Sequence, residues 1–296
     1  MKAYKDYLEK QQYSITTIES YILQAEKFTE WVAKQGLKIN LFRYKEAIQY
    51  VNYLQKTHTN PKTINHKLTA TKHYFNYLIN SNEITTNPFT ALKVQGEKKN
   101  RLLHNLLSSD ELEDLYYSYE TETDKHPRRI LANKRNKVII GLLVYQGLTT
   151  SDLKRLELEH LELYKGKIYI PRGNIGNRRT LELKPWQVLE FIEYIGEVRP
   201  KLLPTNNQDL QLVFIASQNR LTDTVANIIK KLKKINHKII NIHQIRASVI
   251  VNWLNQYNLR KVQILAGHKY ISTTERYVQE DLRQLQEIVN LYHPLS

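Results

Sequence analysis

The sequence contains no cysteine among its 296 residues, which excludes disulfide bonds and thiolate metal sites. Its first residues, MKAYKDYLEK, lack the apolar run of a signal peptide, and no segment approaches the ~20 apolar residues of a membrane-spanning helix. A GxxxxGK[ST] phosphate-binding loop is also absent. These absences predict a cytoplasmic protein that has no membrane partner.

Acidic residues are scarce relative to basic ones. The chain has 44 Lys and Arg against 29 Asp and Glu, a net charge of +15 and a pI of about 9.6. Residues 1–100 hold 15 basic and 8 acidic side chains, and residues 101–296 hold 29 and 21. An excess of this sign favours a polyanion through counterion release. Because both parts are basic, we expect a clamp that grips a DNA duplex from two sides.

The chain is long enough for about two domains, each with its own core. The first hundred residues read as helices. Thr16-x-x-Glu19 is a candidate capping box, and apolar residues follow at helical spacing as far as Val32, with Gly36 as a stop. Further helices are expected over residues 44–57 and 61–79, where Pro61 fits the first turn of the second.

The helix expected over residues 61–79 has two distinct sides. Its apolar side carries Ile64, Leu68, Phe75 and Leu78. The opposite side is predicted to carry Lys62, His66, Thr69 and His73. Such a polar side fits a DNA groove, and the alternative is an ordinary solvated helix surface.

A change of composition separates the two domains. VQGEKKNRLLHN, residues 94–105, interrupts the periodic pattern with charge and a glycine, and SSDELEDL then opens a new helix with an N-cap and an acidic first turn. We predict a helical domain at 1–93, a linker at 94–106 and a second domain at 107–296.

The second domain alternates helices with short strands. Strands are expected at residues 167–171, at 180–183 and in LVFIAS from Leu212, and helices at 133–146, 185–195, 223–234, 241–254 and 259–265. The fold expected for the whole chain is mostly α with a small antiparallel β-sheet.

Two stretches near the end of the chain carry the chemistry. In NIHQIRAS, His243 and Arg246 lie three residues apart and share one face of a helix. In LAGHKYISTTERYV, a turn at Gly267 presents His268, and Tyr277 follows nine residues later. A phenol beside imidazoles and a guanidinium suits nucleophilic phosphoryl transfer without a metal. The alternative makes the histidines core or cap residues and Tyr277 one of 20 ordinary tyrosines.

The spacing of these four residues resembles that of the tyrosine recombinase (phage integrase) family, and in particular of Xer-like and mobile-element integrases. The C-terminal box of that family is H-x-x-R, then L-x-G-H, then a nucleophilic Tyr nine residues after that His. The resemblance implies that Tyr277 forms a covalent 3′-phosphotyrosine and releases a 5′-hydroxyl. It implies that Arg246, His243 and His268 bind the phosphate or assist proton transfer, with no metal, ATP or other cofactor.

The N-terminal part adds to the resemblance. Its S-x-x-T-x-x-x-Y…F pattern, at Ser14, Thr17, Tyr21 and Phe28, is similar to the helical core-binding (SAM-like) domain that precedes the recombinase catalytic domain. The implied partner is double-stranded DNA with an inverted-repeat core site, bound by a homo-tetramer on two duplexes, with accessory DNA-bending proteins and a nucleoid-associated location.

Two positions depart from the family pattern. The first catalytic Arg of the family lies in T-G-L-R-x-S-E-L, whereas QGLTTSDL here has the neutral Thr149 in its place. The family also has a Lys in the following hairpin as general acid. IPRGNIGNRRTLEL places Arg172 there, which we expect to act as a phosphate clamp because an Arg hardly releases its proton.

Two further arginines at the far end of the hairpin offer compensation. Either Arg178 or Arg179 could place a guanidinium in the space that Thr149 leaves; of the two, we assign the catalytic role to Arg178 and a DNA contact to Arg179. The alternative for both is a DNA-backbone contact or a solvated hairpin tip.

An apolar stripe follows Tyr277 in the sequence. Leu282, Leu285, Val289 and Tyr292 recur at the spacing of a short amphipathic helix. That helix is expected to pack on its own domain or, by the resemblance, to dock on a neighbouring protomer.

Three functions are consistent with these patterns. The first is a site-specific recombinase or integrase. The second is a cleavage-deficient DNA-binding protein of the same fold, motivated by Thr149 and the missing hairpin Lys. The third is a type IB topoisomerase-like strand relaxase.

Overall fold

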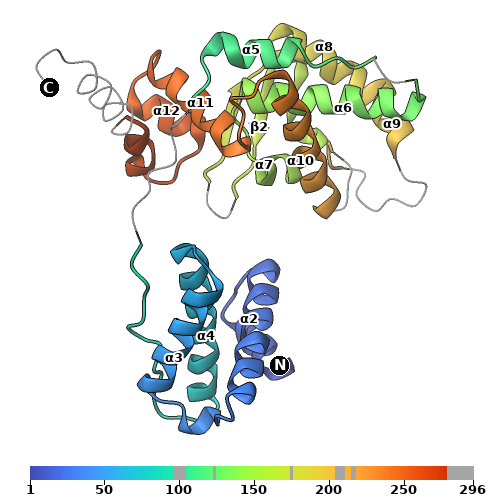
Figure 1. Cartoon of the computed structure of the whole chain (residues 1–296). Coiled ribbons are helices and arrows are strands. Elements are labelled where there is room, and N and C mark those ends of the chain that lie inside the picture. Colours follow the sequence, from blue (N-terminus) through green and yellow to red (C-terminus); the bar gives the residue numbers. More distant parts are fainter. Residues whose placement is uncertain (97–104, 123–124, 174–175, 204–210, 215–217, 279–296) are drawn as a thin grey trace, which may run out of the picture. The chain divides into compact units, whose positions relative to one another are not determined.

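The computed structural model describes residues 1–96, 105–122, 125–173, 176–203, 211–214 and 218–278. The chain divides into two compact units, Met1–Lys99 and Asn100–Ser296. Figure 1 draws the elements of both, and each unit is described by itself. No helix among the described residues is both long and apolar enough to cross a bilayer.

The first unit is built from helices. They are α1 (Lys2–Lys10), α2 (Ile15–Lys34), α3 (Tyr44–Thr57) and α4 (Pro61–Asn80), with a short 3₁₀ turn at Ile39–Leu41. Aromatic rings fill its core, where Phe28 meets Tyr50, Phe75 and Phe89 edge to face. The helices predicted at 44–57 and 61–79 are α3 and α4, and their bounds are confirmed to within a residue.

Two sequence predictions about this unit are wrong. The N-cap of α2 is Ser14 rather than Thr16, because the Ser14 hydroxyl accepts the Thr17 backbone N–H at 3.4 Å. His73 does not project away from the packed side of α4: its ring stacks on Tyr21 of α2 with centroids 5.0 Å apart. Helix α2 packs along α4, so the side of α4 that looked polar in the sequence is partly covered.

The second unit combines many helices with one small sheet. Its helices are α5 (Ser109–Tyr117), α6 (Pro127–Val144), α7 (Thr150–Lys154), α8 (Pro185–Glu193), α9 (Arg199–Leu202), α10 (Gln218–Ile235), α11 (Ile242–Leu254) and α12 (Leu259–Ala266). The antiparallel sheet has the order β1 (Leu161–Glu162), β2 (Lys167–Ile170), β3 (Arg179–Glu182). The expected fold class, mostly α with a small antiparallel sheet, is confirmed.

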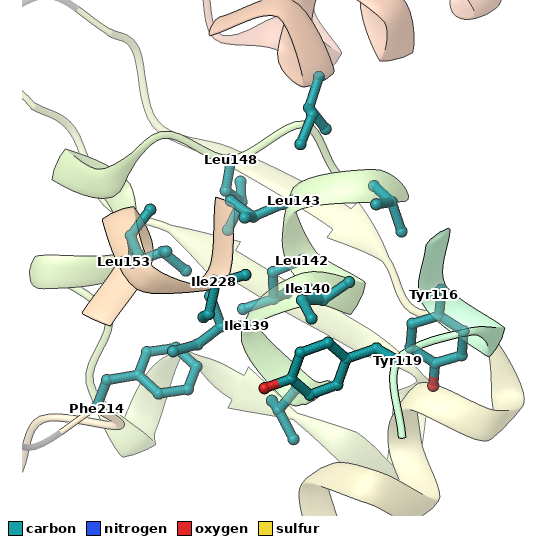
Figure 2. Close-up of a cluster of buried hydrophobic side chains, with 14 of the residues drawn as sticks. Tyr116, Tyr119, Ile139, Ile140, Leu142, Leu143, Leu148, Leu153, Phe214 and Ile228 are labelled. Atoms are coloured by element: carbon teal, nitrogen blue, oxygen red, sulfur yellow. The ribbon is translucent and has the colours of Figure 1, made fainter. Parts of the chain in front are cut away.

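Helix α6 is the centre of this unit. Residues 138–144 are all buried, and Figure 2 shows Ile139, Ile140, Leu142 and Leu143 at the middle of the cluster. α6 contacts α5, α8, α10 and α11. The sequence predicted its start too late, at residue 133, because its first two turns carry no apolar stripe; Pro127 fixes the true start. The buried C-terminal half of α6 supports α11, which carries the candidate site.

The strand expected from Leu212 is a single bridge in the described residues. Leu212 pairs with Glu157, and the Val213 N–H donates to the Leu156 carbonyl at 2.8 Å. Residues 215–217 of that stretch, and the predicted amphipathic helix at Leu282–Tyr292, lie outside the described residues.

Candidate active site

Arg246 connects two loops of the second unit. It lies on α11, whose N-cap Asn241 accepts the Gln244 N–H at 3.0 Å. The Arg246 guanidinium donates through Nη1 to the Gly147 carbonyl and through Nη2 to the Ala266 carbonyl, both at 2.6 Å. A guanidinium has five N–H donors, so others are available for an anion after these two bonds form. The two carbonyls therefore hold Arg246 in place before any substrate arrives.

The turn after α12 holds His268. α12 ends at Gly267, whose φ of +69° is the left-handed conformation that favours glycine at this position. The His268 N–H donates to the Gln263 carbonyl at 3.0 Å, and Gln263 Nε2 donates back to the His268 carbonyl at 3.1 Å. The main chain on both sides of the imidazole is thus fixed by α12.

The hydrogen bonds of the His268 ring assign its tautomer. Nε2 faces Nη2 of Arg246 at 3.5 Å, and Nδ1 lies 2.8 Å from the buried Thr274 hydroxyl. Because a guanidinium can only donate, Nε2 carries the lone pair and Nδ1–H donates to Thr274. Burial lowers the pKa of His268 to about 4, with further lowering by Arg246 and Arg179. The imidazole is therefore neutral at pH 7.

Tyr277 lies against His268. It belongs to a helical stretch at residues 271–278, and its ring stacks on the imidazole with centroids 5.9 Å apart and planes inclined by 10°. It also packs on a small apolar cluster of Ile250, Val262 and Ala266. Burial raises the pKa of the Tyr277 phenol, and Arg246 and Arg276 only partly counteract this effect. The phenol is therefore protonated at neutral pH and needs a base before it can attack.

His243 lies one turn before Arg246 on α11 and is exposed. The structure records no hydrogen bond from its ring to any other described residue. It is thus on the expected helix face, free to meet a ligand. Its role as a phosphate contact stays a prediction.

The β2–β3 hairpin approaches the His268 turn. Gly176 forms a bridge with His268, and the Asn177 N–H donates to the Gly267 carbonyl at 2.8 Å. Arg172 and Arg178 of this hairpin are exposed and line an open cleft with Tyr169 and Asn177. Neither forms an ion pair or hydrogen bond with another described side chain. In this structure Arg178 lies in that cleft, and its catalytic role stays a prediction.

Arg179, and not its neighbour, enters the site. Its side chain is only 2% exposed, and its Nη2 donates to Asp152 Oδ2 at 3.2 Å. The reason is strand alternation: the first residue of β3 points into the core while the residues beside it face solvent. The predicted surface contact of Arg179 with DNA is therefore wrong.

Asp152 is the residue that sequence reasoning missed. Its Oδ2 accepts the Thr149 N–H at 3.0 Å and the Thr149 hydroxyl at 2.9 Å, and its Oδ1 accepts from Arg155 at 3.1 Å. Burial raises the pKa of Asp152, but Arg179, Thr149 and Arg246 lower it more, so the carboxylate is ionised. The Thr149-x-x-Asp152 capping box was the available signal, since it fixes the start of α7.

Around Asp152 the charges do not balance. Arg155 and Arg179 both pair with this one carboxylate, and Arg246 is close enough to lower its pKa as well. Burying cations without counterions is costly, so a site with this excess is arranged for an anion. A phosphate group meets that requirement because guanidinium forks match its oxygens.

The described residues also contain one grouping of possible metal ligands, in the turn after α7. One ligand atom each from Glu157, Glu159 and His160 lies within 4.8 Å of the others. However, His160 Nδ1 already accepts the Glu157 backbone N–H at 2.9 Å, and Glu159 is exposed. This grouping caps a turn, and we assign it no ion.

Both parts of the chain match known domains. Residues 105–283 match the phage integrase family, and residues 1–83 match the phage integrase N-terminal SAM-like domain. Tyrosine recombinase XerC of Staphylococcus saprophyticus is 26% identical over 288 residues, which cover 96% of this chain and 93% of the relative. A XerC from Staphylococcus aureus is 25% identical over 285 residues, covering 95% and 92%.

Solved structures share the fold. The XerH site-specific recombinase bound to a palindromic difH substrate superposes with a TM-score of 0.69 at 20% identity, covering 97% of this chain and 84% of that one. The Tn1549 transposon integrase, in complex with a circular intermediate DNA, gives a TM-score of 0.67 at 15% identity, covering 96% and 98%.

Proposed function

The chain belongs to the phage integrase family, and we propose that it is a site-specific tyrosine recombinase that cleaves and rejoins DNA through Tyr277. The curated relatives are named tyrosine recombinases, and XerH is a site-specific recombinase crystallised in a post-cleavage complex. One observation carries the proposal to these residues: one chain places the Tyr277 ring on His268 and His268 beside the fixed Arg246 guanidinium.

The reaction follows from what each group offers. The Tyr277 oxygen attacks the scissile phosphorus while its proton passes to a base, and the bond from phosphorus to the 5′-oxygen breaks. Negative charge grows on the non-bridging oxygens, and the remaining N–H donors of the fixed Arg246 guanidinium can stabilise it. The departing 5′-oxygen takes up a proton and leaves as a hydroxyl, which reverses these steps when strands rejoin.

His268 is suited to the proton transfer. Its Nε2 lone pair faces Arg246 Nη2 at 3.5 Å before DNA binds, and a phosphate that takes up this guanidinium would leave the lone pair able to accept a proton and would favour protonation by adding negative charge nearby. Before DNA binds, burial, with Arg246 and Arg179, keeps the imidazole neutral by lowering its pKa, so it can act as a base rather than a donor.

The partner we propose is double-stranded DNA, with an inverted-repeat core site. The proposal is supported by the net charge of +15 and by the DNA complexes of the structural relatives. We further propose that Arg172, Arg178 and the exposed Lys62, His66 and Thr69 contact the duplex. The proposed assembly is a homo-tetramer on two duplexes in the nucleoid, helped by DNA-bending proteins.

A nicked suicide substrate tests the function. A duplex with inverted repeats, selected from a randomised pool for binding to the full chain, is nicked near the cleaved bond so that the released fragment diffuses away. We expect a denaturant-stable adduct at the DNA 3′ end, formed with a chelator present and no ATP. Tight binding without an adduct would instead identify a cleavage-deficient DNA-binding protein. Relaxation of a plasmid without recombinant products would identify a strand relaxase.

A further inference from the structure

Position 149 offers the candidate site a neutral hydroxyl, yet a buried guanidinium reaches the same place from another element. We propose that Arg179 is a positioning residue for DNA cleavage, which supplies from β3 the fixed positive charge that Thr149 does not provide. It acts on the phosphate through Arg246 and His268 rather than by touching the DNA. This inference rests on the proposed function.

The first support is a shared acceptor. The Thr149 hydroxyl and Arg179 Nη2 both donate to the same atom, Asp152 Oδ2, at 2.9 and 3.2 Å. The guanidinium of Arg179 is therefore next to the side chain of position 149, although 30 residues of sequence separate the two. A guanidinium introduced at position 149 would compete for the same carboxylate oxygen.

The second support is how closely Arg179 lies to the His268 turn. A Cβ added at Gly267 would come within 2.5 Å of Arg179 Nη1. That contact is possible only because residue 267 has no side chain. Gly267 precedes His268 and follows Ala266, whose carbonyl accepts from Arg246. Arg179 thus lies directly beneath the main chain that joins the two groups assigned to the phosphate.

The third support is that the buried positive charge of Arg179 is not fully compensated by its hydrogen bonds and its ion pair. Its Nε is buried with no hydrogen-bond partner among the described residues, so the side chain is not placed there simply to complete a network. Asp152, the carboxylate that pairs with it in the part of the chain that the structure describes, is shared with Arg155. Burying an incompletely neutralised guanidinium costs stability, and such a cost is typical of a residue retained for function.

The electrostatic effect reaches the reacting groups. Arg179 lowers the pKa of His268, after burial and Arg246, and it adds to the effect of burial in lowering the pKa of Arg246. These effects show that its charge is felt at both side chains. In a site that excludes water, a fixed cation stabilises the added negative charge of the transition state without having to reorganise.

Two substitutions separate charge from packing. Arg179→Met keeps much of the volume and removes the charge, whereas Arg179→Lys keeps the charge and loses the fork. We expect Arg179→Met to slow adduct formation by up to about 10²-fold, the lower end of the range for a donor that touches the reacting oxygens, and Arg179→Lys to slow it by about tenfold at most. A residue with only a structural role would lose as much with Lys as with Met.

The pKa of His268, measured by NMR, gives a readout that does not require DNA. In Arg179→Met it should rise above about 4 by the part of the lowering that Arg179 causes, while burial and Arg246 still hold it below the ordinary value, and in Arg179→Lys it should stay low. Arg155→Met is the matched control, because it removes the other guanidinium from the same carboxylate and should leave the His268 pKa unchanged. Asp152→Asn combined with Arg179→Met removes both members of the Asp152–Arg179 ion pair. This double variant tests the loss of the Arg179 charge without leaving an unpaired buried carboxylate at position 152.

A rescue experiment completes the test. Thr149→Arg in the Arg179→Met background should restore adduct formation at least about tenfold, because the new guanidinium can pair with the same Asp152 oxygen. If Arg179→Met cleaves within about threefold of wild type and leaves the His268 pKa unchanged, the proposal is wrong. If wild type itself forms no adduct, the proposed function fails, while the NMR result still decides whether Arg179 sets the charge at His268.

Discussion

The candidate site has two halves of different origin. Arg246, His268 and Tyr277 come from one continuous stretch of α11, α12 and the following helix, at spacings that the sequence displays. Arg179 and Asp152 come from β3 and α7, and only the tertiary fold brings them together. The first half carries the reacting groups, and the second half supplies buried charge beneath them.

A catalytic charge need not come from a fixed place in the sequence. What the phosphate senses is the position of a guanidinium and not the element that carries it. Helix α7 retains the carboxylate, and the cation that pairs with it comes from the neighbouring strand.

Removal of Arg246 should have the largest effect. Arg246→Met takes away the guanidinium and leaves the Gly147 and Ala266 carbonyls without their donor. We expect adduct formation to fall by about 10³-fold, at the upper end of the range for a transition-state donor. The measurement is the single-turnover rate on the nicked duplex at saturating protein.

Arg178→Met is the control for this variant, because Arg178 is exposed and outside the cluster. It should cleave within about threefold of wild type once DNA is saturated, with a lower affinity and a shallower salt dependence. If Arg178→Met lost as much cleavage rate as Arg246→Met, Arg178 would belong to the catalytic cluster and the comparison of the two halves would be wrong.

Gly267→Ala should damage the contact between the halves. A Cβ at this position meets Arg179 Nη1 at 2.5 Å and must also adopt a φ of +69°. We expect a loss of about 2–3 kcal/mol in unfolding free energy and slower cleavage. Gly166→Ala shares the left-handed backbone, with φ +61° and its nearest neighbour at 3.8 Å, so it should cost only about 1 kcal/mol. Equal losses in chemical denaturation would show that Arg179 is not packed against the turn.

The low pKa of His268 makes a signed prediction about pH. Between about 4 and 6.5 the unfolded chain binds a proton at this residue that the folded chain does not. Stability therefore decreases as the pH falls through this window. His268→Gln removes the titration, so its unfolding free energy should depend less steeply on pH there than that of wild type. Parallel curves for the two proteins would contradict the assigned environment of the imidazole.

The smallest effects are expected in the first unit, on α4. Lys62 is exposed, so Lys62→Ala should weaken DNA binding, reduce the salt slope by about one and leave stability unchanged. His73 stacks on Tyr21, so His73→Ala should lower stability by about 1 kcal/mol and affect DNA binding only through that loss. The opposite assignment of effects would restore His73 to the DNA-facing side.

The sequence predicted what is encoded locally. Helical periodicity, Pro61 and the interval from His268 to Tyr277 are all short-range signals, and the elements that they indicated are present. The predicted helix start was wrong for α2, where Ser14 and Thr16 are both possible N-caps. It was also wrong for α6, whose first turns lack an apolar stripe.

Local sequence signals do not show which of Arg178 and Arg179 is buried. Both are basic residues at the hairpin end, and a shift of one residue in strand register exchanges the buried and exposed sides. The register is fixed by pairing of Ile170 with Arg179 and Ile168 with Leu181, which places Arg179 toward the core. Sequence reasoning had no measure of this register, and for the same reason it did not identify Asp152 as the partner.

The most direct test is to identify the residue that becomes attached to DNA. Trypsin separates Tyr277, in YVQEDLR, from its nearest rival Tyr270, in YISTTER, which is 61% exposed. Mass spectrometry of the digested adduct should find the nucleotide on the Tyr277 peptide, with Tyr277→Phe forming no adduct and Tyr270→Phe forming it normally. A nucleotide on any other tyrosine, or an adduct formed by Tyr277→Phe, would contradict the account.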